Sequence, residues 1–192
     1  MNLCVFCGSS SGKASRYREA AVELARVAVA RGWGIVYGGG NVGLMGVVAD
    51  AALEAGGRVV GVIPRHLMER ELGHGGVTEL HVVGSMHERK ALMADVSDAF
   101  VALPGGFGTL DEFCEILTWA QLGLHAKPCG ILNVNGFFAP FLEQCDRAVA
   151  EGFLRPEHRD LIRVATGPES LMQALEAAPP PALPKWLDED DR

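Results

Sequence analysis

One segment combines a strand pattern, a turn and a helical pattern in direct succession. Residues 34–57 read GIVYGGGNVGLMGVVADAALEAGG. The apolar run Gly34–Tyr37 fits a buried strand, and the glycine-rich run Gly38–Gly43 fits a tight turn. Leu44–Ala55 then has the period of a helix, which the following glycine pair would end. A strand, a glycine turn and a helix in this order form the repeating unit of parallel α/β sheets.

The same alternation of short apolar runs and longer helical patterns recurs along the chain. The expected strands are residues 2–6, 34–37, 58–63, 79–83, 99–103, 129–133 and, with the weakest pattern, 161–165. The expected helices are residues 15–31, 44–55, 85–97, 109–122, 137–151 and 169–178. This order predicts an α/β fold with a parallel central sheet of six to seven strands. We expect residues 1–178 to form a single domain and the Pro-rich, acidic residues 179–192 to form an appended tail.

Composition and charge narrow the class of function. The formal net charge of -7 disfavours a nucleic-acid binder, so an anionic ligand would have to be captured locally. The chain has 5 Cys, no signal-peptide pattern and no apolar run long enough for a membrane helix. We therefore expect a cytoplasmic protein with no membrane partner. Cys4 and Cys7 form a C-x-x-C, but residues three apart in a strand point to opposite faces, and the His residues lack metal-ligand spacing, so we expect no metal.

Three glycine-rich runs each follow an expected strand: residues 7–12, 38–43 and 104–109. Ligands of open parallel sheets bind at the carboxyl ends of the strands, where free backbone N–H groups and helix N-termini attract anions. We therefore expect these turns to hold a phosphate. The candidate contacts are Gly8, Ser9, Gly39, Gly40 and Gly105. The alternative is that the glycines only permit tight turns.

Two common nucleotide motifs fit poorly. Gly38, Gly40 and Gly43 have the G-x-G-x-x-G spacing of a dinucleotide site, but the next expected strand ends without the acidic residue that would bind the ribose. Arg65 near that position leaves NADP as a minor alternative. No Walker A sequence occurs, which excludes a P-loop site for ATP or GTP.

A cationic pair begins the helix expected after residue 85. Ser85 and Glu88 fit a capping box, and Arg89 and Lys90 follow directly. Cations in the first turns oppose the helix dipole, so local stability does not explain them. They are either solvated, or Arg89 and Lys90 bind an anionic or hydroxylated ligand.

Glu112 is the candidate carboxylate of the site. Thr109 and Glu112 also fit a capping box, which would be a purely structural role. However, this box follows directly on a glycine-rich turn after a strand, where a carboxylate on the first helical turn can face a ligand. A phosphate held by backbone N–H groups with a carboxylate further along the ligand suggests chemistry on the sugar of a nucleotide.

These residues resemble the signatures of one known family. Residues 104–112 read PGGFGTLDE and match the P-G-G-x-G-T-x-x-E signature of the Lonely Guy family, the cytokinin riboside 5′-monophosphate phosphoribohydrolases. Residues 86–90, MHERK, match its second signature, and residues 38–46 its first glycine loop. The likeness runs from Cys4 to about Ala165, with one departure at Ser85, where relatives often carry an acidic residue.

The resemblance implies a Rossmann-like, three-layer fold and hydrolysis of the N-glycosidic bond of purine nucleoside 5′-monophosphates, AMP or N6-prenylated AMP, without a cofactor. It places Arg89 and Glu112 at the catalytic positions. It places substrate contacts at Glu71, Arg89, Lys90, Gly106, Phe107, Gly108, Thr109, Leu110, Asp111, Glu112 and Thr118. It also implies a homodimer or a larger homo-oligomer.

Two other classes of function remain open. Related Rossmann-like proteins resemble carriers of the molybdenum cofactor or nucleotide sensors, which would bind without turnover. Proteins with the P-G-G-x-G-T signature have also been labelled lysine decarboxylases. Pyridoxal phosphate chemistry would need a Schiff-base lysine, for which the candidates are Lys13, Lys90, Lys127 and Lys185.

Overall fold

A computed structural model describes residues 1–68 and 73–178 of the chain. It contains a seven-stranded sheet in the order β4-β3-β2-β1-β5-β6-β7, in which every neighbouring pair is parallel. The strands are β1 Asn2–Phe6, β2 Gly34–Tyr37, β3 Val59–Pro64, β4 Glu79–Val83, β5 Ala99–Ala102, β6 Cys129–Leu132 and β7 Ile162–Ala165. The predicted α/β class and the seven strands are therefore confirmed.

The longer helices also agree with the sequence pattern, except at their ends. They are α1 Ser15–Ala30, α2 Gly43–Glu54, α4 Met86–Asp95, α5 Phe107–Gln121, α6 Ala139–Ala150 and α8 Pro168–Glu176. The sequence did not predict three short elements: α3 Arg65–Met68, α7 Pro156–Arg159 and the 3-10 turn Val134–Gly136. Each is too short to show a helical period.

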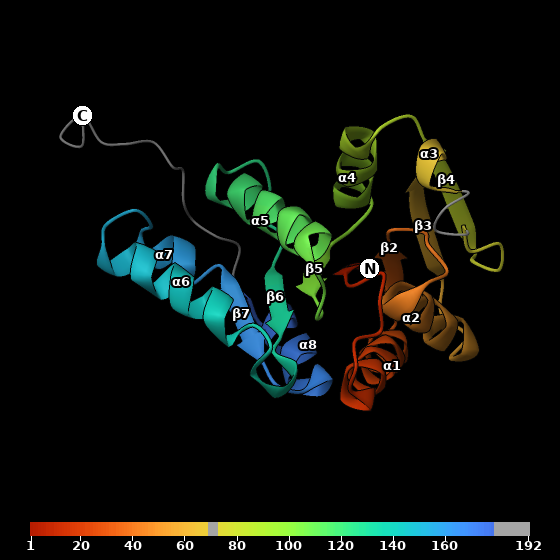
Figure 1. Ribbon diagram of the computed structural model, residues 1–192, viewed down its shortest axis with the longest axis horizontal. Helices are drawn as coiled ribbons and strands as arrows, with labels where there is room; N and C mark the ends of the chain where they lie inside the picture. The colour runs from red at the N-terminus through yellow and green to blue at the C-terminus, as the bar shows by residue number, and fades with distance from the viewer. Residues whose placement is uncertain (69–72, 179–192) are drawn as a thin grey trace.

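The sheet separates two layers of helices (Figure 1). α1, α2 and α8 cover one face, where Leu24 of α1 and Leu171 of α8 belong to the same buried cluster. α4, α5 and α6 cover the other, where Met93 of α4 and Phe113 of α5 lie in the second cluster. The predicted three-layer arrangement is thus confirmed. No helix among the described residues is long and apolar enough to cross a bilayer.

The order of the strands places the site. The chain runs outward from β1 through β2 and β3 to β4, and then returns to β5 on the other side of β1. The reversal therefore lies between β1 and β5, which pair from Leu3 to Phe6 and from Ala99 to Ala102. Crevices at such reversals, at the carboxyl ends of the strands, are where open α/β sheets bind ligands.

Candidate active site at the reversal of strand order

The glycine-rich loops after β1, β2 and β5 meet at the reversal. The backbone N–H of Gly8 donates to the carbonyl of Pro104 at 3.1 Å, which joins the loops after β1 and β5. The N–H of Leu44, at the start of α2, donates to the carbonyl of Gly8 at 3.0 Å. Gly43 has a φ of 58°, and a Cβ there would overlap with the backbone of Ser9. Glycine is thus required where these loops cross.

The N-terminus of α5 lies open at this junction. α5 begins at Phe107, and its N-cap residue, Gly106, makes no side-chain capping hydrogen bond. The N–H groups of the first turn and the helix dipole favour an anion at this end. The predicted capping box of Thr109 and Glu112 is wrong. Thr109 is already inside the helix and buried, because its side chain packs against Gly105, where a Cβ would overlap with the hydroxyl.

Arg89 is brought to the site by α4. The predicted capping box at the start of α4 is confirmed: Ser85 Oγ accepts from the N–H of Glu88 at 3.1 Å, although Glu88 Oε2 accepts from Gly84 rather than from Ser85. The Arg89 side chain is only 7% exposed. Its Nη2 donates to the carbonyl of Gly38 at 3.0 Å, and its buried Nε finds no hydrogen-bond acceptor among the described residues. A donor left in this state is satisfied most simply by a bound ligand.

Glu112 faces Arg89 from the second turn of α5. Its Oε1 lies 3.8 Å from Nη1 of Arg89, and its side chain is 11% exposed. Burial, and next the charge of Glu112, raise the pKa of the Cys7 thiol at the end of β1. Cys7 therefore stays protonated at neutral pH. The reactive groups of this corner are thus a guanidinium and a carboxylate, which can orient a ligand and serve as base or charge stabiliser.

These groups line a cavity of about 220 Å³. Its walls are Cys7, Gly8, Ser9, Met45, Arg89, Gly106, Phe107, Gly108, Thr109 and Glu112. A second cavity of about 270 Å³ adjoins it and shares Gly8, Ser9 and Gly106 with it, but its other walls include Tyr17, Leu44 and Phe137. The site therefore has a polar part, which holds both charged groups, beside a more apolar part.

The residues that the sequence singled out fall into four groups. Gly8, Ser9, Arg89, Glu112 and residues 106–109 line the polar cavity, and Gly105 lines the adjoining one. Others point elsewhere: Gly39 packs against Val62 and Ile63, Gly40 pairs with Gly73, Leu110 packs against the core, and Thr118 donates to the carbonyl of Cys114. Lys90 and Asp111 bind each other at 3.3 Å. Glu71 lies outside the described residues.

The sequence did not predict three residues of the site: Gly38, Met45 and Cys7. Gly38 is the most informative, because a Cβ there would overlap with the Arg89 guanidinium. Gly38 lay inside a recognised glycine run, but nothing local in the sequence indicated that Arg89 would pack on it. Cys4 and Cys7 belong to the clusters on opposite faces of the sheet, as the strand pattern predicted. Within residues 1–68 and 73–178, no group of three or more His, Cys, Asp or Glu side chains is arranged to hold a metal ion.

The fold and the cavity define an α/β protein of the Rossmann-like class with a small-ligand site at its strand reversal. Solved structures agree on the fold: the molybdenum cofactor carrier protein of Chlamydomonas reinhardtii superimposes with a TM-score of 0.68 at 23% identity, covering 91% of this chain and 94% of that one. That similarity shows the fold alone.

Sequence relatives identify the family. The family model described as "Possible lysine decarboxylase" matches residues 45–175. A probable cytokinin riboside 5′-monophosphate phosphoribohydrolase of Oryza sativa subsp. japonica is 58% identical over 91% of this chain and 77% of its own length. A cytokinin riboside 5′-monophosphate phosphoribohydrolase of Arabidopsis thaliana is 51% identical over 93% of this chain and 83% of its own. The chain belongs to this family, the Lonely Guy family that its two signatures indicated.

Proposed function

We propose that this protein hydrolyses the N-glycosidic bond of purine nucleoside 5′-monophosphates of the cytokinin riboside type, releasing the base and ribose 5-phosphate. The observation that carries the proposal is the placement of Arg89 and Glu112, 3.8 Å apart, in one cavity with the open N-terminus of α5. This arrangement offers an anion site and a carboxylate within the length of one nucleotide. The activity in the names of the relatives from rice and Arabidopsis supports the same reaction.

The N-terminal turn of α5 is the proposed phosphate site. Gly106, Gly108 and Thr109 line the cavity there, and no neighbouring atom lies within 4 Å of where a Cβ of Gly106 or Gly108 would stand. A ligand can therefore approach the backbone closely and accept hydrogen bonds from its N–H groups. Gly8 and Ser9 face the same space from the loop after β1. Local capture of this kind fits a protein whose net charge of -7 would otherwise repel anions.

Glu112 is the proposed catalytic carboxylate. When the bond between C1′ and the base nitrogen breaks, the electron pair leaves with the base and positive charge develops on the ribose. A carboxylate beside C1′ stabilises this charge or removes a proton from the water that adds to C1′. The water supplies the hydroxyl that forms the new bond to C1′, and its proton ends on the base nitrogen that took the electron pair, so the base departs neutral. Arg89 would orient the ribose hydroxyls or phosphate and hold Glu112 in place, and its buried Nε is a donor available for this contact.

A Schiff-base lysine has less support. Lys127 donates to the carbonyl of Ala94 at 2.7 Å, and Lys90 is paired with carboxylates of α5. Lys13 is exposed on the loop before α1, and Lys185 lies outside the described residues. The cation that lines the polar cavity is instead Arg89, which cannot form a Schiff base.

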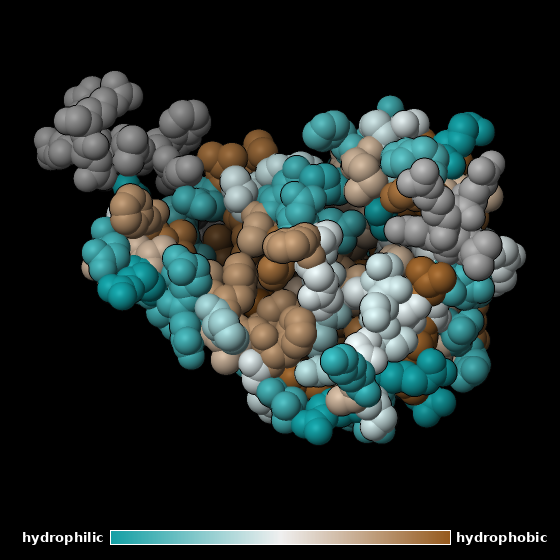
Figure 2. Space-filling view, in the orientation of Figure 1, coloured by the Kyte–Doolittle hydropathy of each residue, from teal (hydrophilic) through white to brown (hydrophobic). Residues whose placement is uncertain are grey.

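We also propose that the protein is a cytoplasmic homodimer. No residue of α6, all of which is described, is fully buried, although its apolar side chains Phe141, Leu142 and Cys145 face the second core cluster. Hydrophobic residues gather over the α5 and α6 region in Figure 2. A second copy would cover this surface. All 5 cysteines are free thiols, which supports a reducing compartment. Analytical ultracentrifugation of the wild type and of Leu124→Glu checks the self-association, since Leu124 follows α5 and is 70% exposed; the variant should sediment as a monomer.

The reaction is tested by incubating the protein with AMP and with isopentenyladenosine 5′-monophosphate and following free base and ribose 5-phosphate by chromatography. Glu112→Gln should lower kcat by on the order of 10²-fold or more, because the variant keeps the shape of the side chain but loses its charge. Glu54→Gln, in an exposed pair with Arg26, is the matched control and should keep wild-type turnover. Tight binding of nucleotide without any release of base would instead favour a carrier or sensor of the same fold.

A further inference from the structure

A second ionic contact lies directly beside the Arg89–Glu112 pair. Lys90 Nζ is 3.0 Å from Oε2 of Glu115 and 3.3 Å from Oδ2 of Asp111. The Lys90 side chain is only 12% exposed. Burial alone would lower the pKa of Lys90, but Glu115 and Asp111 outweigh it and raise the pKa above its ordinary value. The ammonium therefore stays charged and bound to both carboxylates.

The ion pairs of Arg89 and of Lys90 both connect α4 to α5. Arg89 and Lys90 are consecutive in α4, and Asp111, Glu112 and Glu115 lie within little more than one turn of α5. Asp111 and Glu115 are four residues apart and so share a face of the helix, where both reach Lys90. Glu112 is turned toward Arg89. Anything that moves Lys90 relative to Glu115 thus also moves Arg89 relative to Glu112.

The two helices pack mainly on different strands, although Met93 of α4 and Phe113 of α5 belong to one buried cluster. α4 packs on β3 and β4, whereas α5 packs on β5 and β1, which lie on the other side of β2 (Figure 1). The Arg89–Glu112 distance of 3.8 Å is too long for a strong charge-assisted hydrogen bond, and the short contact of the Arg89 guanidinium is with the carbonyl of Gly38. The contacts of Lys90, at 3.0 and 3.3 Å, are shorter than 3.8 Å and join α4 to α5 directly.

We propose that Lys90 is a positioning residue, whose bridge to Glu115 and Asp111 holds α4 against α5 and keeps Arg89 opposite Glu112. This inference rests on the proposed function. It differs from the role that family resemblance implies for Lys90, which is contact with the substrate. The ammonium already has two carboxylate partners, and an anionic phosphate would have to compete with both.

The two roles differ most clearly at Glu115. If Lys90 positions the helices, Lys90→Gln lowers kcat for AMP by on the order of 10-fold, because a small displacement of catalytic groups is costly, while KM changes little. Glu115→Gln then lowers kcat in the same direction, but less, since Asp111 still binds Lys90. The double variant falls no further than Lys90→Gln, because both changes break one bridge. Lys90→Arg keeps the charge and recovers part of the lost kcat.

The result that would overturn the proposal is equally specific. If Lys90 binds the phosphate, Lys90→Gln raises KM by about 10-fold or more, and Glu115→Gln leaves kcat unchanged because it frees the ammonium for the ligand. Lys127→Gln is the matched control, since Lys127 also binds α4, but at the carbonyl of Ala94 near its far end. It should keep the wild-type kcat; an equal loss in this variant would mean that α4 is merely loosened and would also overturn the proposal.

Failure of the proposed function can be distinguished from failure of this inference. Absence of base release by the wild type would refute the function, without reference to Lys90. Amide hydrogen exchange tests the contact of Lys90 with Glu115 independently of activity. Lys90→Gln and Glu115→Gln should both raise the amide exchange rates in the first turns of α4. Unchanged exchange there in both variants would refute the bridge.

Discussion

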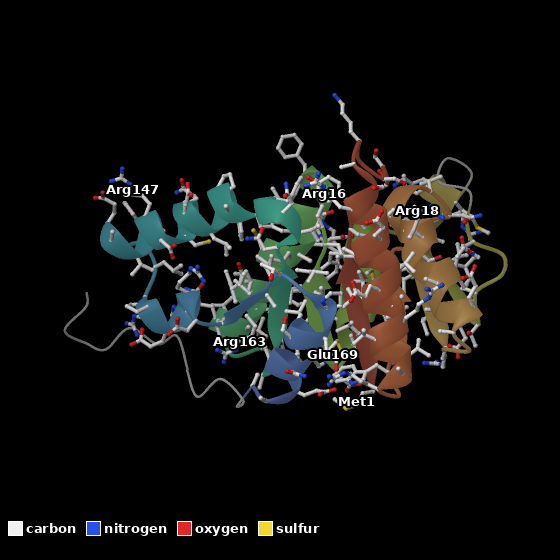
Figure 3. The ribbon with its side chains drawn as sticks, turned by 90° about the horizontal axis from the view of Figure 1, so that it is seen from below. Met1, Arg16, Arg18, Arg147, Arg163 and Glu169 are labelled. Carbon is white, nitrogen blue, oxygen red and sulfur yellow. The ribbon has the colours of Figure 1, made fainter. Side chains whose placement is uncertain are left out.

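The two faces of the sheet are built differently. On one face, α1 packs closely with α2 and also contacts α8, as the view from that side shows (Figure 3). α2 alone buries eight of its residues, Leu44 and Val48 among them. On the other face, α6 buries none of its residues completely, and α4 buries Arg89 beside only Met93 and Ala94. The first face therefore supplies most of the apolar burial, while the second carries the charged groups of the site.

This difference has a physical reason. Buried apolar side chains lower the free energy of the fold without regard to direction, so a face made of them stabilises but does not orient a ligand. Arg89, Glu112 and Lys90 are costly to bury unless they are paired, and their pairing fixes directions. We therefore expect substitutions on the first face to change stability and those on the second to change turnover.

The largest expected effect is on stability, at Leu24 of α1. The side chain is completely buried in the first cluster, so Leu24→Ala should lower the free energy of unfolding by about 2–5 kcal/mol. The kcat of the folded protein should stay near wild type. Leu142→Ala on α6 is the matched change on the other face, and should cost less because Leu142 is half-buried. Urea denaturation checks both. An equal cost at Leu142 that grows with protein concentration would show that a second copy completes the second face.

The arrangement of elements could be predicted from the sequence because strands and longer helices carry their own periodicity. The prediction from sequence fails where contacts between distant residues determine the end of an element. The start of α5 was expected at Thr109, where Thr109 and Glu112 fit a capping box, yet the helix begins at Phe107 and Thr109 packs against Gly105 from inside it.

The site could be predicted only in part, for a similar reason. The positions of Arg89 and Glu112 in the sequence made them candidates but left a solvated cation and a helix cap as alternatives, and only the resemblance placed them at catalytic positions. The partners of Lys90 lie 21 and more residues away on another helix, and Gly38 lies 51 residues from Arg89. No local pattern connects residues at these separations, because their contact depends on how the strands are ordered in the sheet.

Gly38→Ala tests the second face at an intermediate effect. The backbone of Gly38 does not have a positive φ, so alanine is sterically allowed except that its Cβ would overlap with the Arg89 guanidinium. Arg89 must then move away from Glu112, so we expect kcat to fall by on the order of 10²-fold. The added methyl group should also lower the free energy of unfolding by about 1–3 kcal/mol. Steady-state kinetics and urea denaturation separate the two effects. Gly75→Ala, where a Cβ would meet open space, should leave both quantities unchanged.

The smallest expected effect is a pH dependence at His125, which follows α5. Burial lowers the pKa of His125, and its Nε2 donates to the carbonyl of Ile116 at 2.9 Å while Nδ1 accepts from the N–H of Lys127 at 3.1 Å. This geometry requires the neutral ring. Because the folded-state pKa lies below the unfolded value of about 6.5, the folded state binds fewer protons in the window between the two values. Stability should therefore be fully present above that window and decrease as the pH falls through it.

Melting temperatures between pH 8 and pH 5 check this contribution, with His125→Gln as the comparison. Glutamine can still donate to the carbonyl of Ile116 but does not titrate, so the variant should lose less stability on acidification than the wild type. A slope that is unchanged in His125→Gln would show that the second face does not depend on a neutral ring at this position.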